Sequence, residues 1–130
     1  MDWYAFLRLA KELVESSEGL GHYDKEARQR SAVSRAYYAI FLSVRDVFDP
    51  EHESLSNEER KEYHAKLWKR LKNDPHHPDH RYIGEQARVL GESRRQADYG
   101  AFIYDLPNFV ADAIANAEDL KERLERLYPV

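Results

Sequence analysis

Cysteine is absent from the chain, which excludes disulfides, thiolate catalysis and all-cysteine zinc sites. No apolar run approaches the roughly 18 residues that a membrane-spanning helix needs. The first residues carry an acid, Asp2, where a secretory signal peptide carries a basic residue. These absences predict a cytoplasmic protein without a membrane segment.

Strand signals are also missing, whereas helical periodicity runs along the whole chain. A length of 130 residues suits one domain, spanning 1–130. The five glycines and five prolines fall mostly between periodic segments. The expected helices span 2–17, 24–48, 56–72 (opened by a capping box at Ser56), 81–99 and 105–127. Short connections between them predict an all-α antiparallel bundle of about five helices.

The expected helix over 24–48 has two unlike faces. One is an ordinary apolar stripe, from Val33 to Phe48. The opposite face mixes small polar residues and arginines with Tyr38 and Leu42 in its middle. A helix of this kind is usually covered on both sides. It is therefore either central in its own bundle or in contact with another subunit, and the second explanation is favoured in part, because a chain of five helices has few left to cover this face.

The net charge of −4 argues against a protein that coats nucleic acid by bulk charge. The charge is uneven, however. Residues 28–45 hold four arginines and no acid, and residues 60–72 hold six bases against one acid, Glu62. Two such stretches can together form an anion-binding groove. On charge alone, two solvated helix faces are the simpler explanation.

Arg94 falls inside the apolar stripe of the helix over 81–99, where an unpaired charge costs several kcal/mol, on the order of 3–5. Asp98 lies four residues further on and can reach it. The pair is either an internal ion pair that orders the helix end or an arginine held ready for a phosphate. Spacing alone favours the ion pair.

Histidines are concentrated in the segment 73–80, which is expected to be a loop stiffened by two prolines. Their nitrogen atoms and two nearby carboxylates suit zinc, nickel or copper. No HExxH pattern or paired-carboxylate motif supports a catalytic metal, so weak adventitious binding at most is expected, and no cofactor. The residues concerned are Asp74, His76, His77, Asp79 and His80.

Two further motifs carry a resemblance to a known family. Residues 30–41 read RSAVSRAYYAIF and resemble the SRAYYAxF helix of small HEPN-domain proteins, and residues 94–99 read RRQADY and fit their RxxADY signature. His64 matches a histidine common in that branch. The resemblance covers about residues 2–128 and the two motifs at this separation are fairly specific.

The resemblance implies a prokaryotic helical bundle that forms a homodimer. Many HEPN proteins belong to toxin–antitoxin or conflict systems, and many are encoded beside a minimal nucleotidyltransferase. Others are metal-independent ribonucleases with an Arg-x(4–6)-His motif. Here Arg94 lacks a histidine at that distance. Arg70 with His76 or His77, and Arg45 with His52, match formally, but those histidines follow prolines in expected loops, and we do not expect them to be catalytic.

Three hypotheses follow for the function. The first is a homodimer that binds a nucleotide, an RNA segment or a nucleotidyltransferase partner, with an interfacial cleft lined by Arg35, Tyr38, Arg94, Asp98 and Tyr99. The second is a metal-independent ribonuclease in which Arg94 clamps the phosphate and His64 is the acid/base group. The third is a structural interaction module whose polar motifs only specify dimer register.

Overall fold

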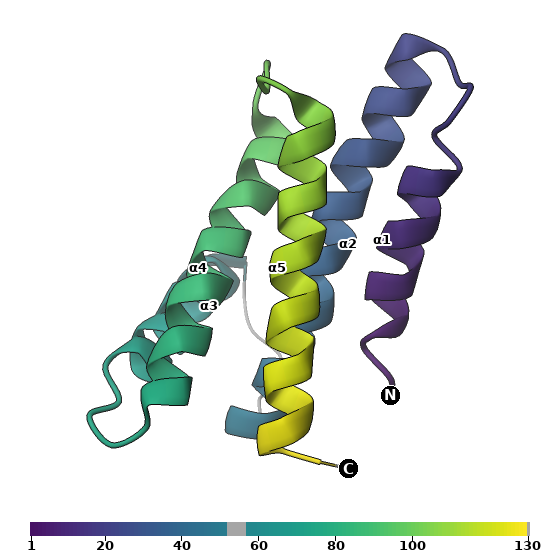
Figure 1. Cartoon of the computed structure of the whole chain (residues 1–130). Helices are drawn as coiled ribbons and strands as arrows, with labels where there is room; N and C mark the ends of the chain where they lie inside the picture. Colours follow the sequence, from purple (N-terminus) through teal and green to yellow (C-terminus); the bar gives the residue numbers. More distant parts are fainter. Residues whose placement is uncertain (52–56, 130) are drawn as a thin grey trace.

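The structure, a computed structural model, describes residues 1–51 and 57–129 and is an all-α bundle (Figure 1). The described part contains five helices and no strand, which confirms the expected fold class. In Figure 1, α1 and α4 run towards the upper end, and α2 and α5 run back. α2 is therefore antiparallel to α1 and α4, which it contacts, and parallel to α5. The helices are α1 (Ala5–Glu15), α2 (His22–Phe48), α3 (Asn57–Lys72), α4 (Pro78–Tyr99) and α5 (Leu106–Leu127).

Two helix starts differ from the expectation by three residues, and α2 begins two residues early, at His22. α4 begins at Pro78, three residues earlier than expected. Proline is tolerated in the first helical turn because the N–H that it lacks would have no hydrogen-bond partner within the helix. α1 begins at Ala5 because the Asp2 carboxylate accepts the Tyr4 N–H at 3.0 Å and holds the preceding residues in a turn. The capping residue expected at Ser56 lies outside the described residues.

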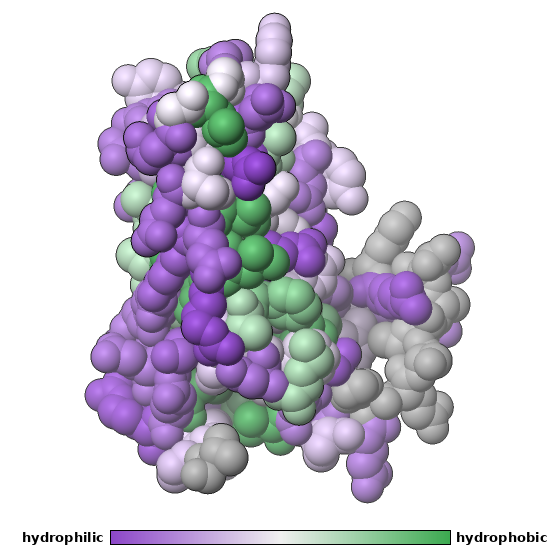
Figure 2. Space-filling view, turned by 90° about the vertical axis from the view of Figure 1, so that its right-hand side faces the viewer, coloured by the Kyte–Doolittle hydropathy of each residue, from purple (hydrophilic) through white to green (hydrophobic). Residues whose placement is uncertain are grey.

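α2 is the central helix of the bundle, in contact with α1, α4 and α5. On its small-polar face Ser34 is buried, and Tyr38 and Leu42 are partly buried against the core. The side of the bundle that carries α1 shows a band of hydrophobic residues between hydrophilic ones (Figure 2). The central position of α2 within one chain therefore explains its unusual second face. Contact with another subunit stays a prediction.

Two glycines of α4 set how closely its neighbours approach. A Cβ atom on Gly84 would lie 2.7 Å from the Lys72 backbone nitrogen and 2.8 Å from the Trp68 carbonyl oxygen, both in α3. A Cβ atom on Gly91 would lie 3.0 Å from the ring of Tyr37, in α2. The backbones of α3 and α4 are thus in direct contact at Gly84. Two helical turns further along α4, at Gly91, the ring of Tyr37 from α2 fills the space beside the helix.

Arg30 joins the first half of α2 to the end of α4. Its Nη1 donates to the carbonyl oxygens of Ala97 at 3.0 Å and Gly100 at 2.6 Å, and its Nε donates to Glu26 at 3.0 Å. The last carbonyls of a helix lack partners within the helix. Arg30, which begins the first sequence motif, therefore caps the C-terminus of the helix that carries the second.

A membrane span would need a long apolar helix, and none of the helices in the described ranges meets that requirement.

Candidate functional site

A groove of about 1020 Å³ lies where α3 and α4 pack over the middle of α2. Its floor is aromatic, with Tyr37 and Tyr38 from α2 and Trp68 from α3, and its walls are largely basic. The described residues of the lining are Tyr37, Tyr38, Arg60, His64, Ala65, Trp68, Lys69, Lys72, Asn73, Arg88, Gly91, Glu92, Arg94, Arg95 and Tyr99.

The described part of the lining holds six lysines and arginines against one carboxylate, Glu92. Among the described residues, no ion pair forms at Arg60, Lys69 or Arg95. The first two come from the basic stretch of α3, and Arg95 faces them from α4. A concave surface lined by charges of one sign concentrates its field, so the groove attracts anions although the whole chain is acidic.

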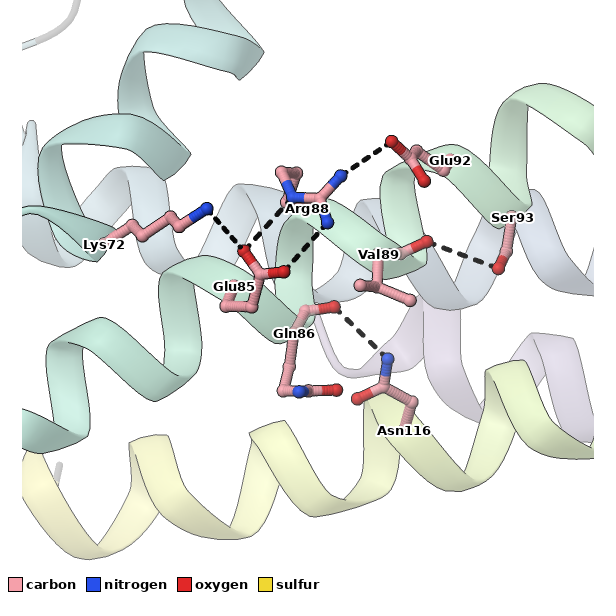
Figure 3. A network of polar contacts seen from close by, with 8 residues as sticks. All are labelled: Lys72, Glu85, Gln86, Arg88, Val89, Glu92, Ser93 and Asn116. Atoms are coloured by element: carbon pink, nitrogen blue, oxygen red, sulfur yellow. Dashed lines mark hydrogen bonds and ion pairs between the residues drawn. The ribbon is translucent and has the colours of Figure 1, made fainter.

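A network of ion pairs forms the rim of the groove on the α3–α4 side (Figure 3). Glu85 accepts from Lys72 at 3.2 Å and from Arg88 at 2.8 Å, and Arg88 also contacts Glu92 at 2.7 Å. Hydrogen bonds from Arg88 and Lys72 lower the pKa of Glu85 to about 2. The network is solvent-exposed, so it orients the two cations more than it stabilises the fold.

Tyr37 connects the floor to the α3 wall. The indole N–H of Trp68 can only donate, so the Tyr37 oxygen accepts it at 3.2 Å. The Tyr37 hydroxyl then donates to His64 Nδ1 at 2.5 Å. This arrangement satisfies the buried hydroxyl and leaves the His64 proton on Nε2. Burial raises the pKa of Tyr37 far above its usual range, so the hydroxyl stays protonated.

His64 is half-buried, with its ring stacked on Phe41 at a centroid distance of 3.8 Å. Burial, together with the positive charges of Arg94 and Arg95, lowers its pKa to about 4. The ring is therefore neutral at neutral pH. With Nδ1 occupied by Tyr37, its Nε2–H is a hydrogen-bond donor.

Arg94 is held by one carboxylate and two rings. Its Nη1 donates to Asp98 at 3.3 Å, and its guanidinium carbon lies 5.6 Å from the Tyr37 ring centroid and 5.7 Å from that of Tyr38. Its Nε is buried and has no hydrogen-bond partner among the described residues. A buried N–H donor without an acceptor is costly, and a turn of the side chain towards the groove would bring it to a ligand oxygen.

The structure brings together four of the residues singled out from the sequence: Tyr38, His64, Arg94 and Tyr99 all line the groove. Asp98 lies behind Arg94 as its ion-pair partner. Arg35 is not part of the lining, because its guanidinium lies over the rings of Phe6 and Tyr38, at 5.7 and 5.8 Å from their centroids.

The formal pair of Arg70 with His76 or His77 does not enter the groove. Arg70, His76 and His77 are absent from its lining, and His77 contacts Asp74 instead. His52, the formal partner of Arg45, lies outside the described residues. The groove contains Arg94 and His64, which lie in different helices, so no short sequence motif can represent this pair.

The motifs mark only Arg94 of the cationic wall, and the basic stretch over 60–72, for which a solvated helix face was the simpler explanation, supplies Arg60, Lys69 and Lys72. The basic stretch over 60–72 was a usable signal, since Lys69 and Lys72 lie three residues apart on one helix face. On α4, Arg88 and Arg95 are seven residues apart and share a face as well. The partner role of Tyr37 had no sequence signal, because a tyrosine inside an apolar stripe is an ordinary core residue.

Comparisons with protein-family models, with curated proteins and with solved structures found no match.

Proposed function

We propose that the chain is a binding module whose groove holds the phosphate groups of a nucleotide or an RNA segment. The observation that carries this proposal is the arrangement of contacts around the Arg94 guanidinium. Its guanidinium is fixed by Asp98 and by two tyrosine rings, yet its buried Nε–H has no acceptor among the described residues. A phosphate oxygen is the acceptor that an arginine in a basic groove recognises best.

The surrounding charges support a phosphate rather than a neutral ligand. Arg60, Lys69 and Arg95 line the groove without an ion pair among the described residues. Holding such cations near one another costs free energy, which a polyanion recovers on binding. The neutral His64 contributes an N–H donor from the same wall, which adds a directional contact without further charge.

The aromatic groups of the groove favour a ligand that also carries a base. Tyr99 lines the groove at the end of α4 and is 79% exposed. An exposed ring beside a basic groove is a stacking platform for a nucleobase, worth about 1–3 kcal/mol for each stacked base. The groove volume of about 1020 Å³ is sufficient for a nucleotide or a short single-stranded segment.

The resemblance to small HEPN proteins supports the same class of ligand. In that setting the chain would form a homodimer and function in a toxin–antitoxin or conflict system with a minimal nucleotidyltransferase. The proposed groove forms within one chain, so ligand binding and dimerisation are separable properties, and each is measured independently.

Fluorescence anisotropy with a labelled single-stranded RNA of mixed sequence, and with a labelled adenine nucleotide, tests the proposal. We expect binding that weakens steeply between about 50 and 200 mM salt, because cations that contact phosphate release counterions. Arg94→Ala and Arg95→Ala should each weaken binding at least about tenfold. Arg123→Ala is the matched control, since Arg123 lies on α5, pairs with Asp119 and is outside the groove. If neither probe binds, or if the three variants behave alike, the proposal is wrong and a structural role gains support.

A second candidate, metal-independent RNA cleavage, is favoured by one observation: His64 and Arg94 line the same groove and both contact Tyr37. A general base needs a free lone pair, and here the Nδ1 lone pair of His64 accepts the Tyr37 hydroxyl. Cleavage therefore requires His64 to change tautomer. Incubation of labelled RNA with EDTA, using the parent chain, His64→Gln and Arg94→Ala, separates cleavage from binding alone. Cleavage that persists in EDTA and disappears in both variants would establish the ribonuclease.

A further inference from the structure

We propose that Asp74, His77 and His80 form a binding site for a divalent transition-metal ion of the zinc type. The three residues lie where the α3–α4 connection enters α4, with His77 capping the helix and His80 in its first turn. One ligand atom from each lies within 4.8 Å of the others. This site does not depend on the proposed function of the groove.

The donor atoms converge on one point. Nδ1 of His77 and Nδ1 of His80 each lie 3.0 Å from the same oxygen of Asp74, Oδ2. In a tetrahedral zinc site, metal–ligand bonds of about 2.0–2.1 Å separate neighbouring donors by about 3.3 Å. The two separations from Asp74 Oδ2 therefore need to open by only a few tenths of an ångström to admit the ion, and the two nitrogen atoms lie within 4.8 Å of each other.

The ligands are oriented by further contacts. The second Asp74 oxygen, Oδ1, accepts the backbone N–H of His76 at 2.9 Å, which turns Oδ2 towards the two imidazoles. On the far side of the His80 ring, Nε2 lies 2.5 Å from the Tyr128 hydroxyl. Hydrogen bonds to the outer atoms of metal ligands are typical of built sites, where they fix ring orientation.

Each imidazole keeps one proton when a metal ion binds. In the metal-free chain Nδ1–H of His80 donates to Asp74, and Nε2 accepts the Tyr128 hydroxyl. On metal binding the ring stays neutral and changes tautomer: its proton moves to Nε2, which then donates to the Tyr128 oxygen. His77 undergoes the same change of tautomer, with Nε2 towards solvent. The three ligands carry one negative charge, from Asp74.

The structure reduces the number of possible metal ligands that the sequence suggests. The histidine-rich segment offers five possible ligands, and the described structure selects three, leaving out the side chains of His76 and Asp79. Two imidazoles and a carboxylate with a remaining open position form a ligand set that zinc accepts readily. The ion would join the α3–α4 connection to the end of α5, because Tyr128 directly follows that helix.

Calorimetric titration of zinc chloride into the full chain, after dialysis against a chelator and then metal-free buffer, tests the site. We expect one zinc ion per chain and a higher midpoint of thermal unfolding with zinc. His80→Ala and Asp74→Asn should each weaken zinc binding at least about tenfold, and Tyr128→Phe should weaken it by a smaller factor. His76→Ala is the matched control: it removes a neighbouring exposed imidazole, and its backbone N–H is kept.

Three results would overturn the proposal. These are no saturable binding at micromolar zinc, equal loss in His76→Ala and His80→Ala, or full binding by His80→Ala. The last two would indicate adventitious binding by exposed histidines. Circular dichroism of each variant without zinc controls for folding. Asp74→Asn keeps the size of the side chain and so provides an independent readout if His80→Ala is unstable. Failure of this site would leave the groove proposal unaffected, because the anisotropy assays contain no metal.

Discussion

The hydroxyl of Tyr37 lies 2.5 Å from Nδ1 of His64 and connects the core helix α2 to a wall of the groove on α3. The same oxygen accepts the indole N–H of Trp68 at 3.2 Å. One buried atom thus aligns two α3 side chains at once. The contact ties the stability of the bundle to the geometry of the candidate site.

Tyr37→Phe is expected to destabilise the chain by about 1–3 kcal/mol, because the buried N–H of Trp68 loses its acceptor. Urea unfolding followed by tryptophan fluorescence measures this change. Tyr82→Phe is the control, since the Tyr82 hydroxyl donates to Asp119 at the surface, where water replaces the lost contact. Equal effects in the two variants would show that the Tyr37 hydroxyl is not a structural hydrogen-bonding group.

Acidification is expected to destabilise the chain through His64. Its pKa is about 4 in the folded chain and about 6.5 when unfolded. Between these values the unfolded state binds more protons, so the free energy of unfolding rises with pH. The contribution of His64 is complete above about pH 6.5 and is lost as the pH falls towards 4.

Urea unfolding at several pH values tests whether the free energy of unfolding rises with pH. After allowance for solvent screening of a half-buried ring, the contribution is about 1–2 kcal/mol. His64→Gln should flatten the pH dependence, whereas His22→Gln, which removes an exposed histidine of α2, should leave it unchanged. An NMR titration that places the His64 pKa at or above 6.5 would contradict the expectation.

Gly84→Ala is expected to destabilise the chain by about 1–3 kcal/mol, although alanine favours helices. The added Cβ would lie 2.7 Å from backbone nitrogen of Lys72, so α3 has to move away from α4. Ligand binding in the groove should weaken as well, because the movement separates Lys69 of α3 from Arg95 of α4, which both line it. Gly21→Ala is the control, with open space around its Cβ position. Chemical unfolding and the anisotropy assay provide the two readouts, and an unchanged or raised stability would refute the close packing.

Arg30→Ala is expected to loosen the end of α4 by removing a donor shared by the carbonyls of Ala97 and Gly100. Amide hydrogen exchange near residues 97–100 should accelerate by about tenfold or more, in line with a local loss of about 1.4 kcal/mol. Arg28→Ala is the control, because among the described residues the Arg28 guanidinium donates to the exposed Ser16 hydroxyl and not to a helix end. Slow exchange retained in Arg30→Ala would mean that the helix end is held by other contacts.

The bundle could be predicted because each helix carries a strong apolar period. That signal is local in the chain, and it places helices well but helix ends poorly. Pro78 illustrates the difference: a proline marks either the end of a loop or the first helical turn, and the histidines around it have no periodicity that decides between them. Asp2 is a second example of a poorly predicted helix end. Its carboxylate accepts the Tyr4 N–H, and this contact depends on backbone geometry.

The groove could be predicted only in part. Tyr38, Arg94 and Tyr99 were found through their motifs, and His64 through its position in the resemblance. Arg35 was expected beside them, but on the helix it faces α1, where Phe6 lies under its guanidinium. The cations of α3 and α4 face each other only because Gly84 brings the two helices together. The homodimer and the nucleotidyltransferase partner stay predictions.

The ion pairs along the rim of the groove impose a condition on any ligand. Glu85 and Glu92 already neutralise Lys72 and Arg88, so at these positions an incoming phosphate exchanges one counter-charge for another and gains little. The net gain comes from Arg60, Lys69 and Arg95, which form an ion pair with no acid in the described chain. A small monovalent anion cannot reach all three cations at once. The groove should therefore discriminate by the spacing of negative charges along its ligand, and a chain of phosphates meets that condition better than chloride or a single carboxylate.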